Sequence, residues 1–151
     1  MNKKSLQVKT QLAIAKPPHE VFEAIVDPQQ MSHYFISSGS GRMESGKTAR
    51  WVFDDAGMGL DARVKRVEPD RFVSFLWSAS GVEALVEMEM VPANAATLLK
   101  ISESEWPADE KGIARCMEQT QGWVHFLCCM KAYLEYGINL RKGGTVHKKP
   151  D

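Results

Sequence analysis

Residues 113–138, IARCMEQTQGWVHFLCCMKAYLEYGI, decide the fold of this chain. Apolar side chains recur there at spacings of three and four residues, which is the signature of one helix face. The face consists of Trp123, Leu127, Met130, Leu134 and Ile138, and is extended on its flanks by Phe126, Tyr133, Ile113, Met117 and Val124. The apolar arc is then about twice as wide as the ~100° stripe of a helix that lies on a surface. We therefore expect a long helix that other elements wrap on more than one side.

Upstream of this helix, the chain reads mainly as strands separated by turns. Polar and apolar residues alternate over 6–14, a helix is expected over 18–26, and a second short helix through 31–35 has Asp27 as its cap. Further strands are expected, with a weak one at 42–44 and others around 49–53, 60–65, 73–77, 82–90 and 97–103, followed by a loop at 106–112. Turn-linked strands pair antiparallel and need one covered face. The order predicts an α+β fold, in which a curved antiparallel sheet of six or seven strands wraps around the C-terminal helix.

Composition narrows the class of protein. The 151 residues, 44% of them hydrophobic, suffice for one domain, which we place at 1–142, with a flexible tail at 143–151. Lys+Arg and Asp+Glu are equal at 19 each, so the basic excess that nucleic-acid binding needs is missing. The sequence shows neither a signal peptide nor an apolar run long enough to insert into a membrane, and we expect a cytoplasmic protein.

The cysteines and histidines do not predict a metal site. We expect Cys116, Cys128 and Cys129 to be reduced thiols, because they all lie on the same predicted helix and their number is odd. His125 has a metal-like spacing to Cys128 and Cys129, but two ligands are too few for zinc. We expect no cofactor.

Several local motifs resemble the START-like (SRPBCC) helix-grip superfamily, in particular the branch named for the activator of the Hsp90 ATPase. Residues 15–22, AKPPHEVF, are similar to the family's Ala-Pro-x-x-x-Val-Trp opening, and Asp27-Pro28 with Met31 to its Asp-Pro-x-x-Leu. Val67-x-Pro69 ahead of Phe75-x-Trp77 is similar to a strand pair of the family, and Gly122-Trp123 with Leu127 to the start of its last helix. The resemblance implies a groove between sheet and helix that encloses an apolar cavity. In the family, such cavities hold lipids or other hydrophobic molecules, and some members catalyse cyclisation or dehydration there.

The candidate site consists of side chains on the faces that the sheet and the helix turn toward each other. They are Trp51, Phe53, Phe75, Trp77, Met88, Met90, Ile101, Glu103, Trp123, Phe126 and Met130. Either these side chains form an ordinary close-packed core, or several of them border a shape-tolerant pocket, to which aromatic rings and methionines are suited. Glu103 shares the apolar parity of its strand, and we expect its carboxylate to reach water at the strand end. The alternative is that it orients a polar group of a ligand or acts as an acid–base group.

The leading hypothesis is a non-catalytic protein that binds a hydrophobic or amphipathic small molecule, such as a lipid. A cyclase- or hydratase-type enzyme is the first alternative, with Glu103 and His33 as its ionisable candidates. The second is a chaperone-associated interaction module, which predicts an exposed apolar patch and a role in the stress response. The candidate protein partners are thus a second copy of this chain, in a homodimer, and a chaperone. We expect His125, Asp54, Asp55 and Asp61 to be solvated.

Overall fold

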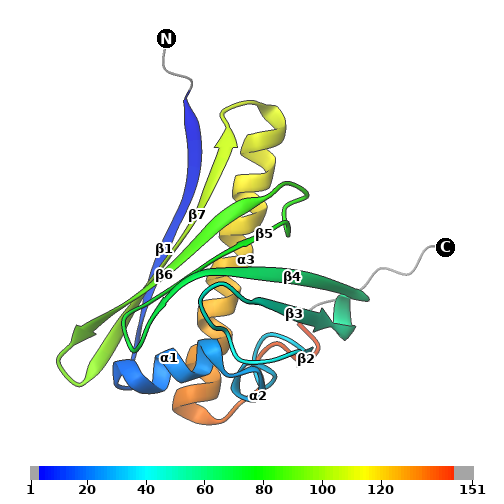
Figure 1. Ribbon diagram of the computed structural model, residues 1–151. Helices are drawn as coiled ribbons and strands as arrows, with labels where there is room; N and C mark the ends of the chain where they lie inside the picture. Colours follow the sequence, from blue (N-terminus) through cyan, green and yellow to red (C-terminus); the bar gives the residue numbers. More distant parts are fainter. Residues whose placement is uncertain (1–3, 145–151) are drawn as a thin grey trace.

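The computed structural model describes residues 4–144 and shows a helix-grip fold, with a curved antiparallel sheet on one side of a long C-terminal helix (Figure 1). The helices are α1 (Pro18–Val26), α2 (Pro28–Met31), the short 3-10 helix η1 (Asp54–Ala56) and α3 (Glu110–Tyr136). The strands are β1 (Ser5–Ile14), β2 (Ser38–Gly39), β3 (Thr48–Phe53), β4 (Met58–Glu68), β5 (Phe72–Trp77), β6 (Ala84–Ala93) and β7 (Ala96–Pro107). The predicted α+β class and strand number are confirmed.

The seven strands form one sheet in the order β1-β7-β6-β5-β4-β3-β2, and every neighbouring pair is antiparallel. The first strand pairs with the last one, so β1 lies at the edge beside β7 while the others follow as a meander. The register puts Glu103 between Val8 of β1 and Val86 of β6. Because side chains alternate across a sheet, the residues next to each other in this register share the inner face.

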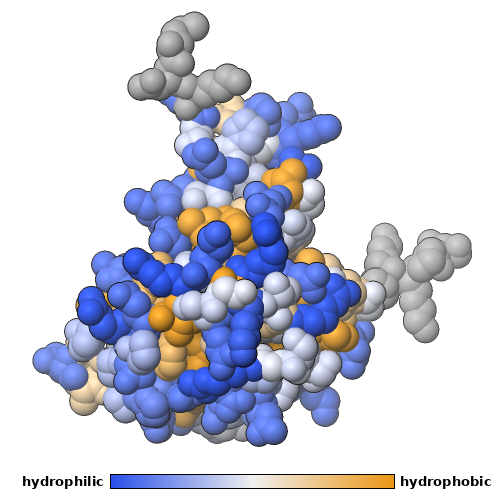
Figure 2. Space-filling model, in the orientation of Figure 1, coloured by the Kyte–Doolittle hydropathy of each residue, from blue (hydrophilic) through white to orange (hydrophobic). Residues whose placement is uncertain are grey.

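The inner face and α3 enclose the hydrophobic core, and α1 and α2 close its lower end (Figure 1). The alternation that predicted the strands also predicted their buried side, since Trp51, Phe75, Met88 and Ile101 are each almost fully buried. In the orientation of Figure 2, the surface is largely hydrophilic with smaller apolar areas. Among residues 4–144, no helix combines the length and the apolar character that crossing a bilayer requires.

Helix α3 begins and ends at conventional caps. The Asp109 side chain accepts a hydrogen bond of 2.8 Å from the Gly112 N–H, and Gly137 ends the helix in the left-handed conformation with φ of 66°. The start of the helix lies so close to β7 that a Cβ on Gly112 would come within 1.7 Å of the Pro107 carbonyl oxygen. A glycine is therefore needed at this contact.

The apolar arc of α3 is narrower than predicted. Its buried residues are Gly112, Trp123, Phe126, Leu127, Cys129 and Met130. Ile113, Met117 and Val124, which the helical wheel placed on one flank of the arc, are 47%, 68% and 45% exposed. The sheet covers one side of α3 and leaves this flank exposed, so the prediction that other elements wrap the helix on more than one side was wrong for this flank.

Two charged side chains tie α3 to the end of the edge strand. Lys131 Nζ donates to the Ala13 carbonyl at 2.8 Å, and the Ala15 N–H donates to Glu135 Oε2 at 2.9 Å. The hydrogen bond from Ala15, followed by that from Lys131, lowers the pKa of Glu135 below its usual range. These contacts occupy backbone groups that an edge strand would otherwise leave unpaired.

Two local expectations differ from the structure. The weak strand expected at 42–44 is absent, and the short strand β2 lies earlier, at Ser38–Gly39. Strand β7 runs on to Pro107, through part of the segment expected to be a loop. Of the flexible tail expected at 143–151, residues 143 and 144 lie in a turn and residues 145–151 lie outside the described residues, so its flexibility stays a prediction.

Candidate functional site

A buried carboxylate forms the polar centre of the interior. Glu103, on the inner face of β7, is 0% exposed, so the prediction that it reaches water was wrong. Trp77 Nε1 donates to its Oε2 at 2.8 Å, and Trp123 Nε1 and Gln119 Nε2 donate to its Oε1 at 2.8 and 2.9 Å. The donors come from β5 and α3, so the carboxylate links the sheet to the helix.

The three donors are neutral, and the ion pairs of the described residues do not include Glu103. A buried carboxylate without a neighbouring cation costs stability unless hydrogen bonds compensate for the lost water. Oε1 accepts two hydrogen bonds and Oε2 accepts one, while each carboxylate oxygen can accept about two. With respect to residues 4–144, Oε2 therefore keeps a free acceptor position for one more donor.

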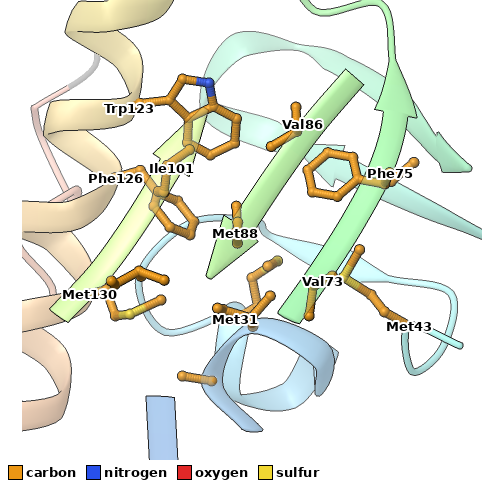
Figure 3. Close-up of a cluster of buried hydrophobic side chains, with 14 of the residues drawn as sticks. Met31, Met43, Val73, Phe75, Val86, Met88, Ile101, Trp123, Phe126 and Met130 are labelled. Carbon is orange, nitrogen blue, oxygen red and sulfur yellow. The ribbon is translucent and has the colours of Figure 1, made fainter. Parts of the chain in front are cut away.

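Aromatic rings surround this carboxylate in a continuous cluster. The Trp77 ring lies 5.3 Å from Trp123, 6.0 Å from Trp51 and 5.5 Å from Phe75. The Trp123 ring lies 5.2 Å from that of Phe126. Most pairs meet edge to face, which is the favoured arrangement of aromatic quadrupoles. The close-up of the core shows how Trp123, Phe126 and Met130 point from α3 toward the strands (Figure 3).

The structure thus brings the sequence-predicted candidates together in one place. The aromatic members are joined by the sulfur-containing side chains of Met88, Met90 and Met130, and Met31 and Met43 add two more from outside the strands. Methionine side chains adapt their shape with little penalty. Whether these residues bind a ligand stays a prediction.

Two surface hollows among residues 4–144 lie away from this interior. A groove of about 450 Å³ opens on the outer face of the sheet, lined by Lys9, Glu87, Glu89 and Lys100 among others. A second hollow, of about 380 Å³, lies between α1 and the turn after β4, beside His19 and Asp70. Because Glu103 and the rings of Trp77 and Trp123 beside it are almost fully buried, a molecule that reaches this carboxylate must displace side chains.

The other polar candidates are dispersed. His33 is exposed and its ring stacks on Tyr133 at 5.2 Å, while His125 is half-buried on α3. Asp61 is exposed and pairs with Arg50, but Asp55 is only 32% exposed and forms an ion pair with Arg141, contrary to the expected solvation. Residues 4–144 contain no group of three potential metal ligands.

Sequence reasoning missed three polar residues of the interior and its edge, Gln119, Arg141 and Tyr34, and expected a fourth, Asp55, to be solvated. Gln119 lies one helical turn before Trp123 on the buried side of α3, and a polar residue at that position of the helical wheel was a usable signal. Arg141 and Asp55 are 86 residues apart, and no local pattern indicates that they meet. Tyr34 is buried as well, its hydroxyl donates to the Ala24 carbonyl, and burial raises the pKa of this phenol well above its usual value.

Comparison with protein families identifies the chain. The model of the family described as activator of Hsp90 ATPase homolog 1-like protein matches residues 15–135. The chain belongs to this family. The resemblance suggested by the sequence motifs is thereby confirmed. No curated protein sequence matches the chain.

Solved structures of this fold are similar over most of the chain. The protein SSP2350 from Staphylococcus saprophyticus is 29% identical, with a TM-score of 0.81 over 90% of this chain and 96% of that one. DynU16, a protein of the dynemicin biosynthetic locus, is 28% identical with a TM-score of 0.77, over 87% of this chain and 48% of its own. The Aha1 dimer from Colwellia psychrerythraea is 20% identical with a TM-score of 0.75, over 87% and 98%.

Proposed function

We propose that this member of the family binds a hydrophobic or amphipathic small molecule between the sheet and α3, without catalysing a reaction. The observation that carries the proposal is the buried Glu103 carboxylate, held by two indoles and an amide in an otherwise apolar interior. Packing alone does not require a carboxylate here, because apolar residues in place of Glu103 and its three donors together would avoid the cost of burying these polar groups. A carboxylate with one free acceptor position can orient the hydroxyl or amine of a ligand.

The surroundings of Glu103 support a site that opens when a ligand enters. The core to which Glu103 belongs combines rigid rings, which supply apolar contact area, with the buried methionines Met88, Met90 and Met130, which can change rotamer. Removing ligand surface from water would contribute about 25 cal/mol per Å² of buried apolar area. Glu103 would mainly fix the orientation of the bound ligand and would contribute less to its affinity.

The test is ligand binding by the intact protein. Native mass spectrometry of the protein purified under mild conditions, with displacement of a hydrophobic dye by a panel of fatty acids, alcohols and polycyclic phenols, should reveal at least one ligand. The fluorescence of Trp77 and Trp123 should change on binding, because both indoles contact Glu103. Glu103→Gln should lower the affinity for ligands that carry a hydroxyl or amine. Glu105→Gln, at an exposed position two residues further along β7, should leave this affinity unchanged. The absence of binding across the panel would contradict the proposal.

The exposed flank of α3 favours a second candidate function, contact with a chaperone of the Hsp90 class. Ile113, Met117 and Val124 form an apolar strip on one side of the helix, as an interaction module requires. The decisive measurement is the ATPase rate of a purified Hsp90 chaperone with and without this protein. A stimulation that Met117→Lys abolishes and Glu118→Lys preserves would support the contact, and an unchanged rate with the unaltered protein would exclude activation.

A further inference from the structure

An ion pair between segments that are distant in sequence lies at one edge of the hydrophobic core, and this edge is called the rim. Arg141 follows α3, and Asp55 belongs to η1 in the connection between β3 and β4. Arg141 Nε donates to Asp55 Oδ2 at 2.9 Å, and Nη2 donates to Oδ1 at 3.3 Å. The guanidinium thus presents its fork to a carboxylate, the geometry in which arginine recognises acid groups.

This ion pair lies over aromatic rings instead of projecting into solvent. The Arg141 guanidinium carbon is 5.6 Å from the centre of the Phe35 ring and 5.5 Å from that of Phe53. The Arg141 side chain is only 18% exposed, an unusual degree of burial for an arginine on a C-terminal segment. Partial burial strengthens its attraction for a carboxylate, because water screens the charges less.

A series of aromatic rings in contact with one another connects Arg141 to Glu103. The Phe35 ring is 5.0 Å from Phe53, 4.8 Å from Phe126 and 6.4 Å from Trp123. Trp123 in turn donates its indole N–H to Glu103. Phe35 is half-buried and lies in the turn after α2, outside any regular helix or strand, so its ring can move without breaking a hydrogen-bonded ladder.

The two ends of this series of rings carry opposite charges, with a cation at the rim and a carboxylate inside. A ligand that lies along these rings can place an acid group next to Arg141, where the opposite charges attract. An acid group next to Glu103 would be repelled by the carboxylate. A cationic head group next to Arg141 would be repelled by the guanidinium. Asp55 already occupies the position that such an acid group would take. We propose that the ligand is an amphipathic anion that enters at Phe35 and binds its acid group to Arg141 in place of Asp55, an inference that rests on the proposed function.

The test compares probes of equal chain length and different charge: decanoate, decanol and decyltrimethylammonium, each below its micelle-forming concentration. Binding to the full chain is followed by tryptophan fluorescence and by calorimetry. We expect decanoate to bind about tenfold more tightly than decanol, as one charge-assisted hydrogen bond allows, and the cation to bind more weakly than either. Arg141→Gln should reduce decanoate affinity to the level of decanol and leave decanol unchanged, whereas the neighbouring exposed Lys142→Gln should change neither.

The variant Asp55→Asn separates this mechanism from a purely structural ion pair. Because Asp55 competes with the ligand for Arg141, its neutralisation should raise decanoate affinity several-fold, whereas Arg141→Gln should lower it. A structural role for the pair would make the two variants change affinity in the same direction, and that result would overturn the inference. Equal binding of the three probes with no effect of Arg141→Gln would also overturn it while leaving the proposed function intact. Failure of all three probes to bind would overturn the inference, and the proposed function is contradicted only when the wider panel of fatty acids, alcohols and polycyclic phenols also fails to bind.

Discussion

At the scale of single residues, the placement of Glu103 shows both the reach and the limit of sequence reasoning. Its parity with Leu99 and Ile101 correctly put the side chain on the inner face of the sheet. The predicted exit to water failed because β7 continues to Pro107, which leaves Glu103 within the strand and not at its end. Parity placed Trp77 and Trp123 on the facing surfaces, but no local pattern indicates that these indoles and Gln119 donate to Glu103, because these contacts depend on how β5 and α3 pack against β7.

The hydrogen bonds of Glu103 predict a large effect of its truncation. Glu103→Ala leaves two buried indole N–H groups and the half-buried Gln119 amide without their acceptor, and should lower the free energy of unfolding by roughly 3 kcal/mol. The matched variant Glu105→Ala, on the same strand but exposed, should stay within about 0.5 kcal/mol of the unaltered protein. Urea denaturation measures both values, and similar losses for the two variants would contradict the buried network.

A pH-dependent contact on the surface involves His19 and Asp70. Their side chains lie 2.9 Å apart, and the hydrogen bond to Asp70, with the attraction of its charge, raises the pKa of His19 above the usual 6.5. The pair therefore adds stability in full below pH 6.5, and this contribution disappears as the pH rises through the higher pKa of the folded state. Asp70→Asn, which suits the left-handed φ of 62° at this turn, should return the pKa of His19 toward 6.5 in an NMR titration. Asp61→Asn is the control, and an equal pKa of His19 in the Asp70 and Asp61 variants would refute the assignment.

At the scale of elements, two glycines of α3 have opposite roles. A methyl group on Gly112 would overlap the Pro107 carbonyl oxygen, while one on Gly122 would meet nothing within 4 Å. Gly112→Ala should lower the free energy of unfolding by roughly 2–3 kcal/mol through overpacking at the start of the helix. Gly122→Ala should raise it by about 0.5–1 kcal/mol, because alanine favours the helical backbone. Thermal melts of the two variants should shift in opposite directions, and a shared direction would show that the close approach is not the cause.

The two flanks of α3 make a similar contrast. Met130 is 0% exposed and Met117 is 68% exposed, although both belong to the apolar arc of the helical wheel. Met130→Ala should cost about 2–5 kcal/mol of stability, whereas Met117→Ala should have almost no effect. The wheel gives the angle of each side chain around the axis but not which side the sheet covers, which explains why the flank of Ile113 was mispredicted. Comparable losses for Met130→Ala and Met117→Ala in urea denaturation would place the covered side elsewhere.

At the scale of the whole molecule, the fold was predictable and the site only partly so. Alternation in the strands and the long amphipathic segment determine a sheet that needs a covering helix, because each buries what the other exposes. The aromatic and methionine candidates followed from the same parity. The rim formed by Asp55 and Arg141 did not, since ion pairs between distant segments depend on how the finished fold positions its loops.

This shared core makes a final prediction about cooperativity. Strand β1 pairs with β7, so the sheet is complete only after the chain from Ala96 onward has folded. Helix α3 then packs on both strands. The four tryptophans, Trp51, Trp77, Trp106 and Trp123, are all buried in this core and report on its sheet and helix parts together. Unfolding in urea should therefore be two-state, with the same midpoint by tryptophan fluorescence and by far-UV circular dichroism, and Met130→Ala should move both midpoints equally. Separate midpoints would mean that α3 detaches while the sheet persists, which the joint burial of Trp77, Glu103 and Trp123 argues against, because releasing the helix strips the Glu103 carboxylate of two of its three donors.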